Sequence, residues 1–299
     1  MKRWYVWLGA AISLVCLYLT VRGLNLSQVW AWMRRAHYGW LVPGVAVYFL
    51  AVLARTWRWH YMLRPVKAVS LHRLFPVLVI GYMGNNVYPA RAGEVIRAYI
   101  LKRKEDVDIS PSLAIIGVER IFDGVVMLFF VFAALPFTPQ PPGMRQLVIY
   151  SSLLFFGALL VCFALAASPQ RAQTLYRWAI ERMLPESWRA RAHGIMDRFM
   201  DGLLCLRSGR DVVMIFVTSV VIWLTETVKY WFVMHAFGFS VTFFVLMLVA
   251  AVGNLATTVP SGPGYVGTFD KSGASVLQAF GVAGPLAVGY TLVLHAALW

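Results

Sequence analysis

Residues 84–97 read Gly-Asn-Asn-Val-Tyr-Pro-Ala-Arg-Ala-Gly-Glu-Val-Ile-Arg. This polar stretch interrupts an apolar segment that begins near Leu74. Ionisable side chains at membrane depth are costly, so they usually face a protein interior or a wet cavity and mark a site. We therefore look for the function in this stretch and in the residues that face it.

The surrounding composition is that of an integral membrane protein. Of the 299 residues, 60% are hydrophobic and 13% are charged, and the mean hydropathy is +0.68. Soluble domains carry about 25% charged residues. In a soluble protein the formal charge of +14 would suggest nucleic acid. Here we expect no nucleic-acid partner, and instead basic loops that set topology and contact anionic lipid headgroups.

Six segments are apolar over about the 20 residues that a bilayer-spanning helix needs. They are 4–22, 39–62, 112–135, 147–167, 212–236 and 284–299. The first is long for a signal peptide and has no clean cleavage site, so we interpret it as a retained span. Two further apolar stretches, 74–104 and 243–282, are interrupted. The predicted fold class is an all-α polytopic membrane protein, one domain over 1–299, with about six full spans and two broken re-entrant hairpins.

The two interruptions are of the same kind. Gly84-Asn85 and Pro89-x-x-x-Gly93 occur in the first, and Gly253-Asn254 and Pro260-x-x-x-Gly264 in the second. Proline breaks helices, and broken backbone at membrane depth is tolerated only inside protein or along a wet cavity. Such a pair in the two halves of a chain points to a transporter site, although Pro-x-x-x-Gly also arises by chance. The expected hinge residues are Pro89, Gly93, Pro260, Gly262 and Gly264.

Basic residues predict the orientation of the chain. The segment 169–210 holds eight arginines against four acids, and we expect amphipathic helices there on the cytoplasmic surface, or else a solvated linker. The basic segment 55–73 falls on the same side, whereas the loops 136–146 and 237–242 carry little charge and face outward. The first broken hairpin then enters from the cytoplasm and the second from outside, in an inverted arrangement. The N-terminus is expected in the cytoplasm.

Arg91, Glu94 and Arg97 recur every three residues in the opening stretch. If a helix starts at Pro89, a favoured first position, the three share one side. A helix N-terminus with guanidinium groups suits a phosphate, and Gly93 would let a headgroup or another backbone approach closely. The alternative is that Glu94 only neutralises the arginines and the trio holds the hairpin together.

Glu119 and Asp123 lie one helical turn apart near the start of the span 112–135, with Arg120 between them. We expect these carboxylates to form a buried network with Arg91 or Arg97. A cytoplasmic rim of charges is the alternative.

Glu226 and Lys229 lie three residues apart in the middle of a span, where an ion pair within the helix is the simple interpretation and a gate the alternative. The stretch 260–270 reads Pro-Ser-Gly-Pro-Gly-Tyr-Val-Gly-Thr-Phe-Asp and follows Asn254. Its exposed amides suit a phosphate or a hydroxyl-rich group, but it lacks the Gly-Lys-Ser/Thr and the βαβ context of a nucleotide site. The histidines are scattered without ligand spacing, so we expect no catalytic group, no metal site and no cofactor.

At these residues the chain resembles the flippase-like membrane family named after the transmembrane region of lysylphosphatidylglycerol synthases. Residues 85–97 resemble its Asn…Pro-Ala-Arg-x-Gly-Glu…Arg pattern, and residues 119–123 its Glu-Arg-x-x-Asp. Residues 260–270 resemble its late Pro/Gly-rich loop, with Asp270 where many members have Glu. The resemblance covers nearly the whole chain and implies a helical protein that moves an amphiphilic lipid between leaflets. The sequence holds no aminoacyltransferase domain, so lysyl transfer is not implied.

The leading hypothesis is a flippase or transporter of the cell membrane for a lipid with a phospho- or aminoacyl-phospho- headgroup. The headgroup would lie in a cavity between the two broken hairpins. The expected substrate-binding residues are Asn85, Asn86, Arg91, Glu94, Arg97, Glu119, Arg120, Asp123, Asn254, Tyr265 and Asp270.

The alternative hypothesis is a membrane-embedded transferase, or an accessory subunit, in aminoacyl-lipid or prenyl-linked glycolipid synthesis. The lack of a nucleotide or acyl-donor site favours transport over enzyme activity. The expected partners are a membrane phospholipid or lipid-linked substrate and a separate lipid-modifying transferase.

Overall fold

The computed structural model describes residues 15, 18, 25–88, 91–137, 144–258 and 263–298. These residues form helices and no strand, which confirms the all-α prediction for this part of the chain. The expected hinges Pro89, Pro260 and Gly262 lie outside the described residues, as does the expected span 4–22 apart from positions 15 and 18. The helices are α2 (Leu26–Arg35), α3 (Leu41–Leu63), α4 (Leu71–Val87), α5 (Ala92–Glu105), α6 (Ile109–Ala134), α7 (Met144–Ala167), α8 (Pro169–Met183), α9 (Glu186–Gly202), α10 (Gly209–Ala236), α11 (Phe243–Ala256), α12 (Thr268–Ala279) and α13 (Gly284–Leu298), with short 3₁₀ turns η1 (Tyr38–Trp40), η2 (Leu135–Phe137), η3 (Leu203–Leu206) and η4 (Pro263–Tyr265).

Three helical segments of the described chain are long and apolar enough to cross a membrane, namely Tyr38–Leu63, Val148–Ala167 and Gly209–Ala236. They comprise η1 with α3, most of α7, and α10. The helices expected at 112–135 and 284–299 are present as α6 and α13. However, α6 carries three charged residues within 119–123 in its middle, and α13 is only 15 residues long, so length and composition do not identify either as a span.

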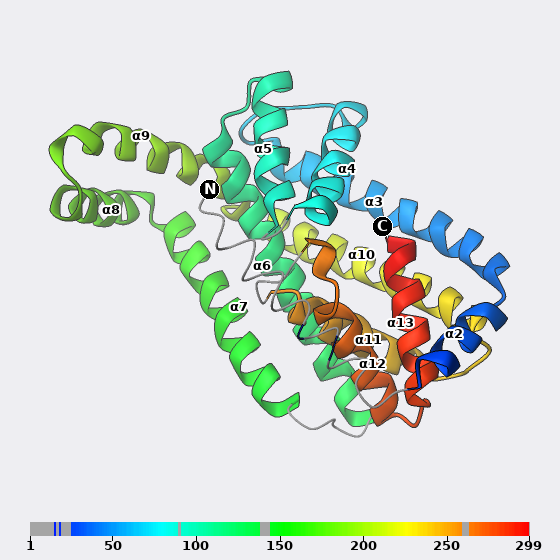
Figure 1. Ribbon diagram of the computed structural model, residues 1–299. Helices are drawn as coiled ribbons and strands as arrows, with labels where there is room; N and C mark the ends of the chain where they lie inside the picture. The colour runs from blue at the N-terminus through cyan, green and yellow to red at the C-terminus, as the bar shows by residue number, and fades with distance from the viewer. Residues whose placement is uncertain are drawn as a thin grey trace.

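Each interrupted stretch forms two short helices separated by a break. The first is the pair α4 and α5, and the second is the pair α11 and α12, with the members of each pair packed side by side (Figure 1). The end of α4 lies against η4 in the second break. The two breaks therefore meet in the middle of the molecule, between α3, α6 and α10 (Figure 1).

The helix after the first break begins later than the sequence suggested. α5 starts at Ala92 rather than at Pro89, and Arg91 precedes it with φ 54° and ψ 34°. In the second break, Tyr265 has φ 61°. Left-handed backbone is uncommon for residues with a side chain, and such strain persists only where the surroundings enforce it. Both breaks thus hold a large side chain in an enforced conformation.

Gly93 allows α4 and α5 to touch through their backbones. A Cβ atom at this position would lie 1.9 Å from the carbonyl oxygen of Gly81 and 2.6 Å from the amide nitrogen of Asn85. A Cβ on Gly84 would lie 2.8 Å from Cα of Gly93. The predicted close backbone approach at Gly93 is therefore confirmed, and the neighbour is α4.

Two apolar cores lie on either side of the breaks. One joins α3, α4 and the first half of α6, and the other joins α11, α12, α13 and the second halves of α6 and α10. Along α6, Phe122 belongs to the first core and Val126 to the second, with Asp123 between them. The boundary between the cores is where the charged side chains gather.

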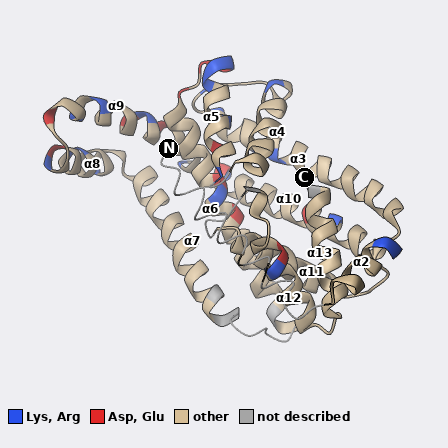
Figure 2. Ribbon diagram, in the orientation of Figure 1, with Lys and Arg blue, Asp and Glu red and all other residues tan. Residues whose placement is uncertain are grey.

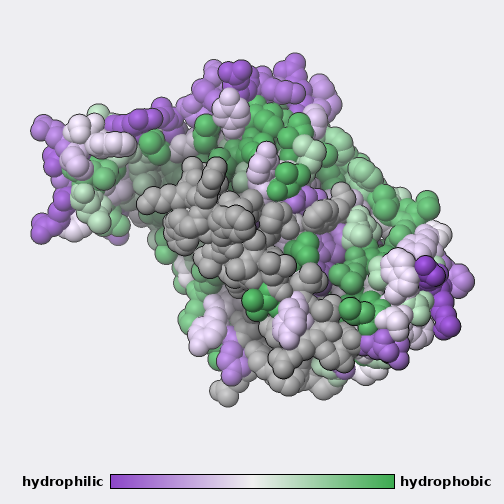
Figure 3. Space-filling model, viewed as in Figure 1, coloured by the Kyte–Doolittle hydropathy of each residue, from purple (hydrophilic) through white to green (hydrophobic). Residues whose placement is uncertain are grey.

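The outer surface is apolar over α7 and charged over α8 and α9. α7 packs on α6 where the ring of Phe155 lies against Gly124, and it leaves Leu153 and Leu160 about 70% exposed. α8 and α9 form an arm that projects from the bundle, in agreement with the helices expected at 169–210 (Figure 1). Figure 2 shows Lys and Arg on this arm and at the outer ends of α4 and α5. In Figure 3 the same regions are hydrophilic.

We predict that Gly93→Ala destabilises the protein by about 3 kcal/mol, because the added methyl group overlaps the backbone of α4. Thermal unfolding in detergent should show a clear loss of Tm. Gly117→Ala in α6 is the matched control, because a Cβ there meets nothing within 4 Å. An unchanged Tm for Gly93→Ala would contradict the close packing of the hairpin.

Candidate functional site

α3 brings two arginines into the interior at the boundary of the cores. Arg55 is 8% exposed and Arg58 is 1% exposed. Both belong to the basic segment 55–73 that was expected on the cytoplasmic surface, and that expectation is wrong for these two because they are buried within α3. Burying a charged side chain without a counter-charge costs too much desolvation free energy, so each arginine needs an acidic partner.

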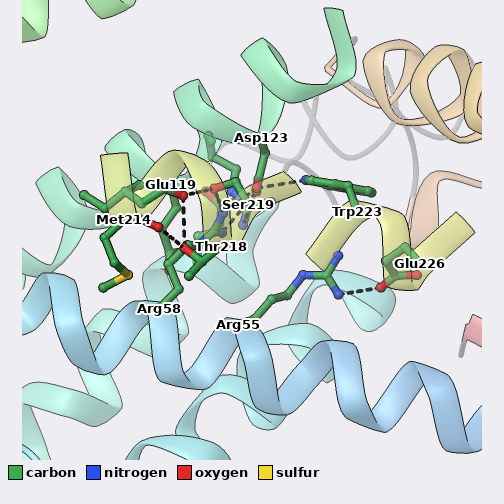
Figure 4. A network of polar contacts seen from close by, with 12 residues as sticks. Arg55, Arg58, Glu119, Asp123, Met214, Thr218, Ser219, Trp223 and Glu226 are labelled. Carbon is green, nitrogen blue, oxygen red and sulfur yellow. Dashed lines mark hydrogen bonds and ion pairs between the residues drawn. The ribbon is translucent and has the colours of Figure 1, made fainter. Parts of the chain in front are cut away.

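Asp123 on α6 is the partner of Arg58. The Nη1 atom of Arg58 donates to Asp123 Oδ1 at 2.8 Å and to Ser219 Oγ at 2.6 Å. Trp223 Nε1 donates to the same carboxylate at 3.0 Å, and Arg120 Nη2 lies 3.2 Å from its other oxygen. Figure 4 shows Arg58, Asp123, Ser219 and Trp223 converging from α3, α6 and α10.

Glu226 on α10 is the partner of Arg55. Arg55 Nη1 donates to Glu226 Oε1 at 2.5 Å, and Lys229 donates to the other carboxylate oxygen from one turn further along α10. The ion pair within the helix predicted for Glu226 and Lys229 is therefore present, with an added arginine from α3 (Figure 4). The gate stays a prediction.

Arg97 on α5 pairs with Glu119 on α6. A buried contact of Glu119 with Arg91 or Arg97 was expected from the sequence, and the partner is Arg97. Arg97 Nη2 donates to Glu119 Oε2 at 2.5 Å, and the guanidinium lies 4.4 Å from the ring centroid of Trp59. Both charged side chains are at most 4% exposed. Glu119 was expected near the start of the span 112–135, but α6 begins at Ile109, so Glu119 lies well inside the helix. The geometry favours a structural role for Arg97.

Arg91 links the two breaks. Its Nη2 donates to Thr257 Oγ1 at 3.0 Å and to the carbonyl oxygen of Thr257 at 3.4 Å, and its guanidinium lies 5.5 Å from the ring of Tyr265. Glu94 is 3.5 Å from Arg91 and 3.6 Å from Arg120. The side chains of these three ionised residues are 23–31% exposed, so they are half-buried rather than fully enclosed.

A cavity of about 170 Å³ opens at this junction. It is lined from both breaks and from α3, α6, α10 and α13. Arg55, Arg91 and Arg120 face it as cations and Glu226 as a carboxylate. The other lining residues are Tyr48, Tyr82, Asn85, Asn86, Trp223, Tyr230, Asn254, Thr257, Gly264, Tyr265, Phe269 and His295.

Asp270 closes the far side of the second break rather than lining the cavity. Its Oδ2 accepts from the amide of Gly267 at 2.9 Å, which caps the start of α12. His295 on α13 lies 2.9 Å from Asp270 through Nδ1 and 2.7 Å from the carbonyl oxygen of Gly264 through Nε2. The expected substrate contact of Asp270 stays a prediction, and its observed contacts hold the loop.

The ion pairs at the junction leave positive charge in excess. Around Glu226, the two cations Arg55 and Lys229 share one carboxylate. In a second linked group three arginines share two carboxylates: Arg58, Arg91 and Arg120 with Asp123 and Glu94. Each group thus carries one formal positive charge more than negative, which suits an anionic ligand.

Many of the residues chosen from the sequence meet at the cavity, and some do not. The cavity brings together Asn85, Asn86, Arg91, Arg120, Asn254, Tyr265 and Glu226. Glu94 and Arg97 border a smaller adjacent hollow, whereas Glu119 and Asp123 hold arginines behind the cavity wall. Arg55 was not expected among the lining residues, although a charge within the expected span 39–62 is itself a signal of a site. The aromatic lining residues gave no such signal, because rings are abundant in every span.

The described part of the chain contains no group of three His, Cys, Asp or Glu that could hold a metal ion. The arrangement offers instead guanidinium donors, side-chain amides and aromatic rings around a small cavity. Such groups bind phosphate and hydroxyl groups by hydrogen bonds.

Comparison with known proteins identifies the family. Residues 6–299 match the family described as Lysylphosphatidylglycerol synthase TM region, so the chain belongs to it. As a member with several apolar helices, the protein is a multi-pass membrane protein. No solved structure matches the chain.

Relatives are found among archaeal proteins. A "UPF0104 membrane protein" from Methanothermobacter thermautotrophicus is 25% identical, over 98% of this chain and 88% of its own length. "Glycosyltransferase AglD" from Haloferax volcanii is 24% identical, over 97% of this chain. The chain spans only 51% of the length of AglD.

We predict that Glu119→Gln lowers the free energy of unfolding by about 3–5 kcal/mol, because it leaves the buried Arg97 without its counter-charge. Chemical denaturation in detergent measures the loss. Asp106→Asn is the control: Asp106 pairs with Lys102 on the surface, and asparagine tolerates its left-handed backbone. Equal stability of the two variants would show that the Arg97–Glu119 pair contributes little.

Proposed function

We propose that this member of the lysylphosphatidylglycerol synthase transmembrane-region family is a transporter that moves a phosphate-bearing lipid between the leaflets of the cell membrane. The observation that carries the proposal is the cavity at the meeting point of the two broken hairpins. It is lined by three arginines inside an otherwise apolar helical bundle.

The cavity supports transport because its side chains can replace the hydrogen bonds that a polar headgroup makes to water. Arg91 and Arg120 are half-buried, and each shares Glu94 rather than holding a carboxylate of its own. Their remaining N–H groups are the phosphate donors, joined by the hydroxyl group of Tyr265. Acyl or prenyl chains stay in the bilayer. Glu119 and Asp123 position the arginines and do not touch the lipid.

The proposed membrane arrangement follows from the helices and their charges. We assign full spans to six segments, including α6 and α13, and treat α4–α5 and α11–α12 as re-entrant hairpins that enter from opposite faces. The basic α8–α9 arm and the outer ends of α4 and α5 lie in the cytoplasm with the N-terminus. Exposed Trp178 and Trp188 on the arm support contact with the membrane interface.

A second candidate is a part of a lipid-modifying enzyme system. The observation that favours it is the relative AglD, which is named a glycosyltransferase and is about twice as long as the region matched. In this alternative the chain is a membrane-embedded transferase or serves a separate transferase that makes an aminoacyl-lipid or a prenyl-linked glycolipid. A headgroup-modified product formed by the purified protein would support it.

For the leading proposal, we predict that Arg91→Ala reduces lipid transfer between leaflets of proteoliposomes at least about tenfold. Removing a charged hydrogen bond costs about 1.5–3 kcal/mol, and about 1.4 kcal/mol is tenfold in rate or affinity. A dithionite-quenching assay with a fluorescent phospholipid measures the rate.

Arg103→Ala is the control, because Arg103 is exposed at the outer end of the same helix. Folding is checked by the unfolding temperature of each variant. A folded Arg91→Ala protein that transfers lipid at the wild-type rate would remove this arginine from the mechanism, and wild-type protein without transfer would remove transport.

The arrangement also predicts which loops face which side. Cysteines placed at Lys104 and Ser240, both exposed, should react with an impermeant maleimide only from the cytoplasm and only from outside, respectively. The test uses a background without the native cysteines. Labelling of both positions from one side would contradict the inverted hairpins.

A further inference from the structure

The charges of the cavity wall discriminate between the headgroups that the proposed function leaves open. Among the described lining residues Glu226 is the carboxylate, and Arg55 and Lys229 occupy both of its oxygens. An ammonium group in the cavity would therefore find no free carboxylate. Burying a cation without a counter-charge is strongly unfavourable, and here the neighbours are cations as well.

Two of the arginines that face the cavity, Arg91 and Arg120, make longer ion pairs than the 2.5 Å pair of Arg55 with Glu226. Within the described chain Arg120 Nε is buried without a hydrogen-bond partner, and the two carboxylates that Arg120 contacts, Glu94 and Asp123, are each shared with another arginine. Arg91 makes no ion pair shorter than 3.5 Å among the described residues. Guanidinium groups in this condition gain from a dense anion such as a phosphate, which accepts several hydrogen bonds at once.

The remaining lining groups are neutral and suit hydroxyls. Among the described residues Asn85 Oδ1 is buried without a hydrogen-bond partner, and both Asn85 and Asn254 line the cavity with their side-chain amides. Amide side chains both donate and accept, as hydroxyl groups do. The rings of Tyr82 and Trp223 also line the cavity and offer flat apolar surface of the kind that the C–H face of a sugar or polyol covers.

Resting on the proposed function, we infer that the cavity takes a lipid whose phosphate carries a neutral sugar or polyol, and discriminates against an aminoacylated headgroup with a net positive charge. Arg91 and Arg120 bind the phosphate. Asn85 and Asn254 bind the hydroxyls. The chain thus differs in ligand charge from what the name of its family suggests.

The test measures binding without transport. Purified protein in detergent is loaded with a short-chain fluorescent phosphatidylglycerol, which is displaced by dihexanoyl phosphatidylglycerol, dihexanoyl phosphatidylinositol, lysyl-dihexanoyl phosphatidylglycerol, or soluble glycerol phosphate. We expect the two polyol lipids to bind at least about tenfold more tightly than the lysyl ester. Equal or tighter binding of the lysyl ester would overturn the inference. Displacement by glycerol phosphate as strong as by the lipids would overturn the lipid assignment.

A charge variant gives an independent readout. Asn85→Asp adds a free carboxylate to the wall and should shift the ratio of affinities at least about tenfold toward the lysyl ester. Asn86→Asp serves if the first variant does not fold. Gln146→Glu, exposed on α7, adds the same charge elsewhere and should leave the ratio unchanged. An unshifted ratio in both folded cavity variants would overturn the inference.

The outcomes separate this inference from the proposed function. Selective binding without leaflet transfer would remove transport and keep the headgroup preference. Leaflet transfer together with unselective binding would keep transport and remove the headgroup preference.

Discussion

The rest of the structure depends on the mutual neutralisation of charges buried where two apolar cores meet. Arg58 is 1% exposed and holds Asp123, which also receives Trp223 and Arg120. Each such charge would be prohibitive alone. Because the partners come from α3, α6 and α10, the pairs fix how these helices cross. The two hairpins pack against these three helices.

Direct backbone contact holds the two helices of the first hairpin together, whereas ion pairs hold α3, α6 and α10 together. Gly93 removes the side chain that would separate α4 from α5, so the first break can reach the centre without a spacer. At the centre Arg91 and Tyr265 adopt left-handed backbone and contact each other across the two breaks. Local strain and close packing thus concentrate at the cavity, as is usual where a site needs precise placement.

The fold could be predicted from the sequence because lipid imposes simple rules on composition and helix breaks. The apolar runs predicted α3, α6, α7, α10 and α13, and the Pro/Gly pattern predicted two helix–break–helix segments. The start of α5 was misplaced, because the left-handed turn at Arg91 depends on contacts with the other break. Arg55 and Arg58 were misassigned, because charge counting cannot distinguish a cytoplasmic loop from an ion pair formed with a helix some 65 or more residues away.

The contact of Arg91 with Thr257 and Tyr265 has a mechanical consequence. It ties the tip of one hairpin to the tip of the other, so neither can tilt away without breaking a bond that the other supplies. Any group that takes over the guanidinium would break this link, so the relative placement of the two hairpins depends on what Arg91 contacts.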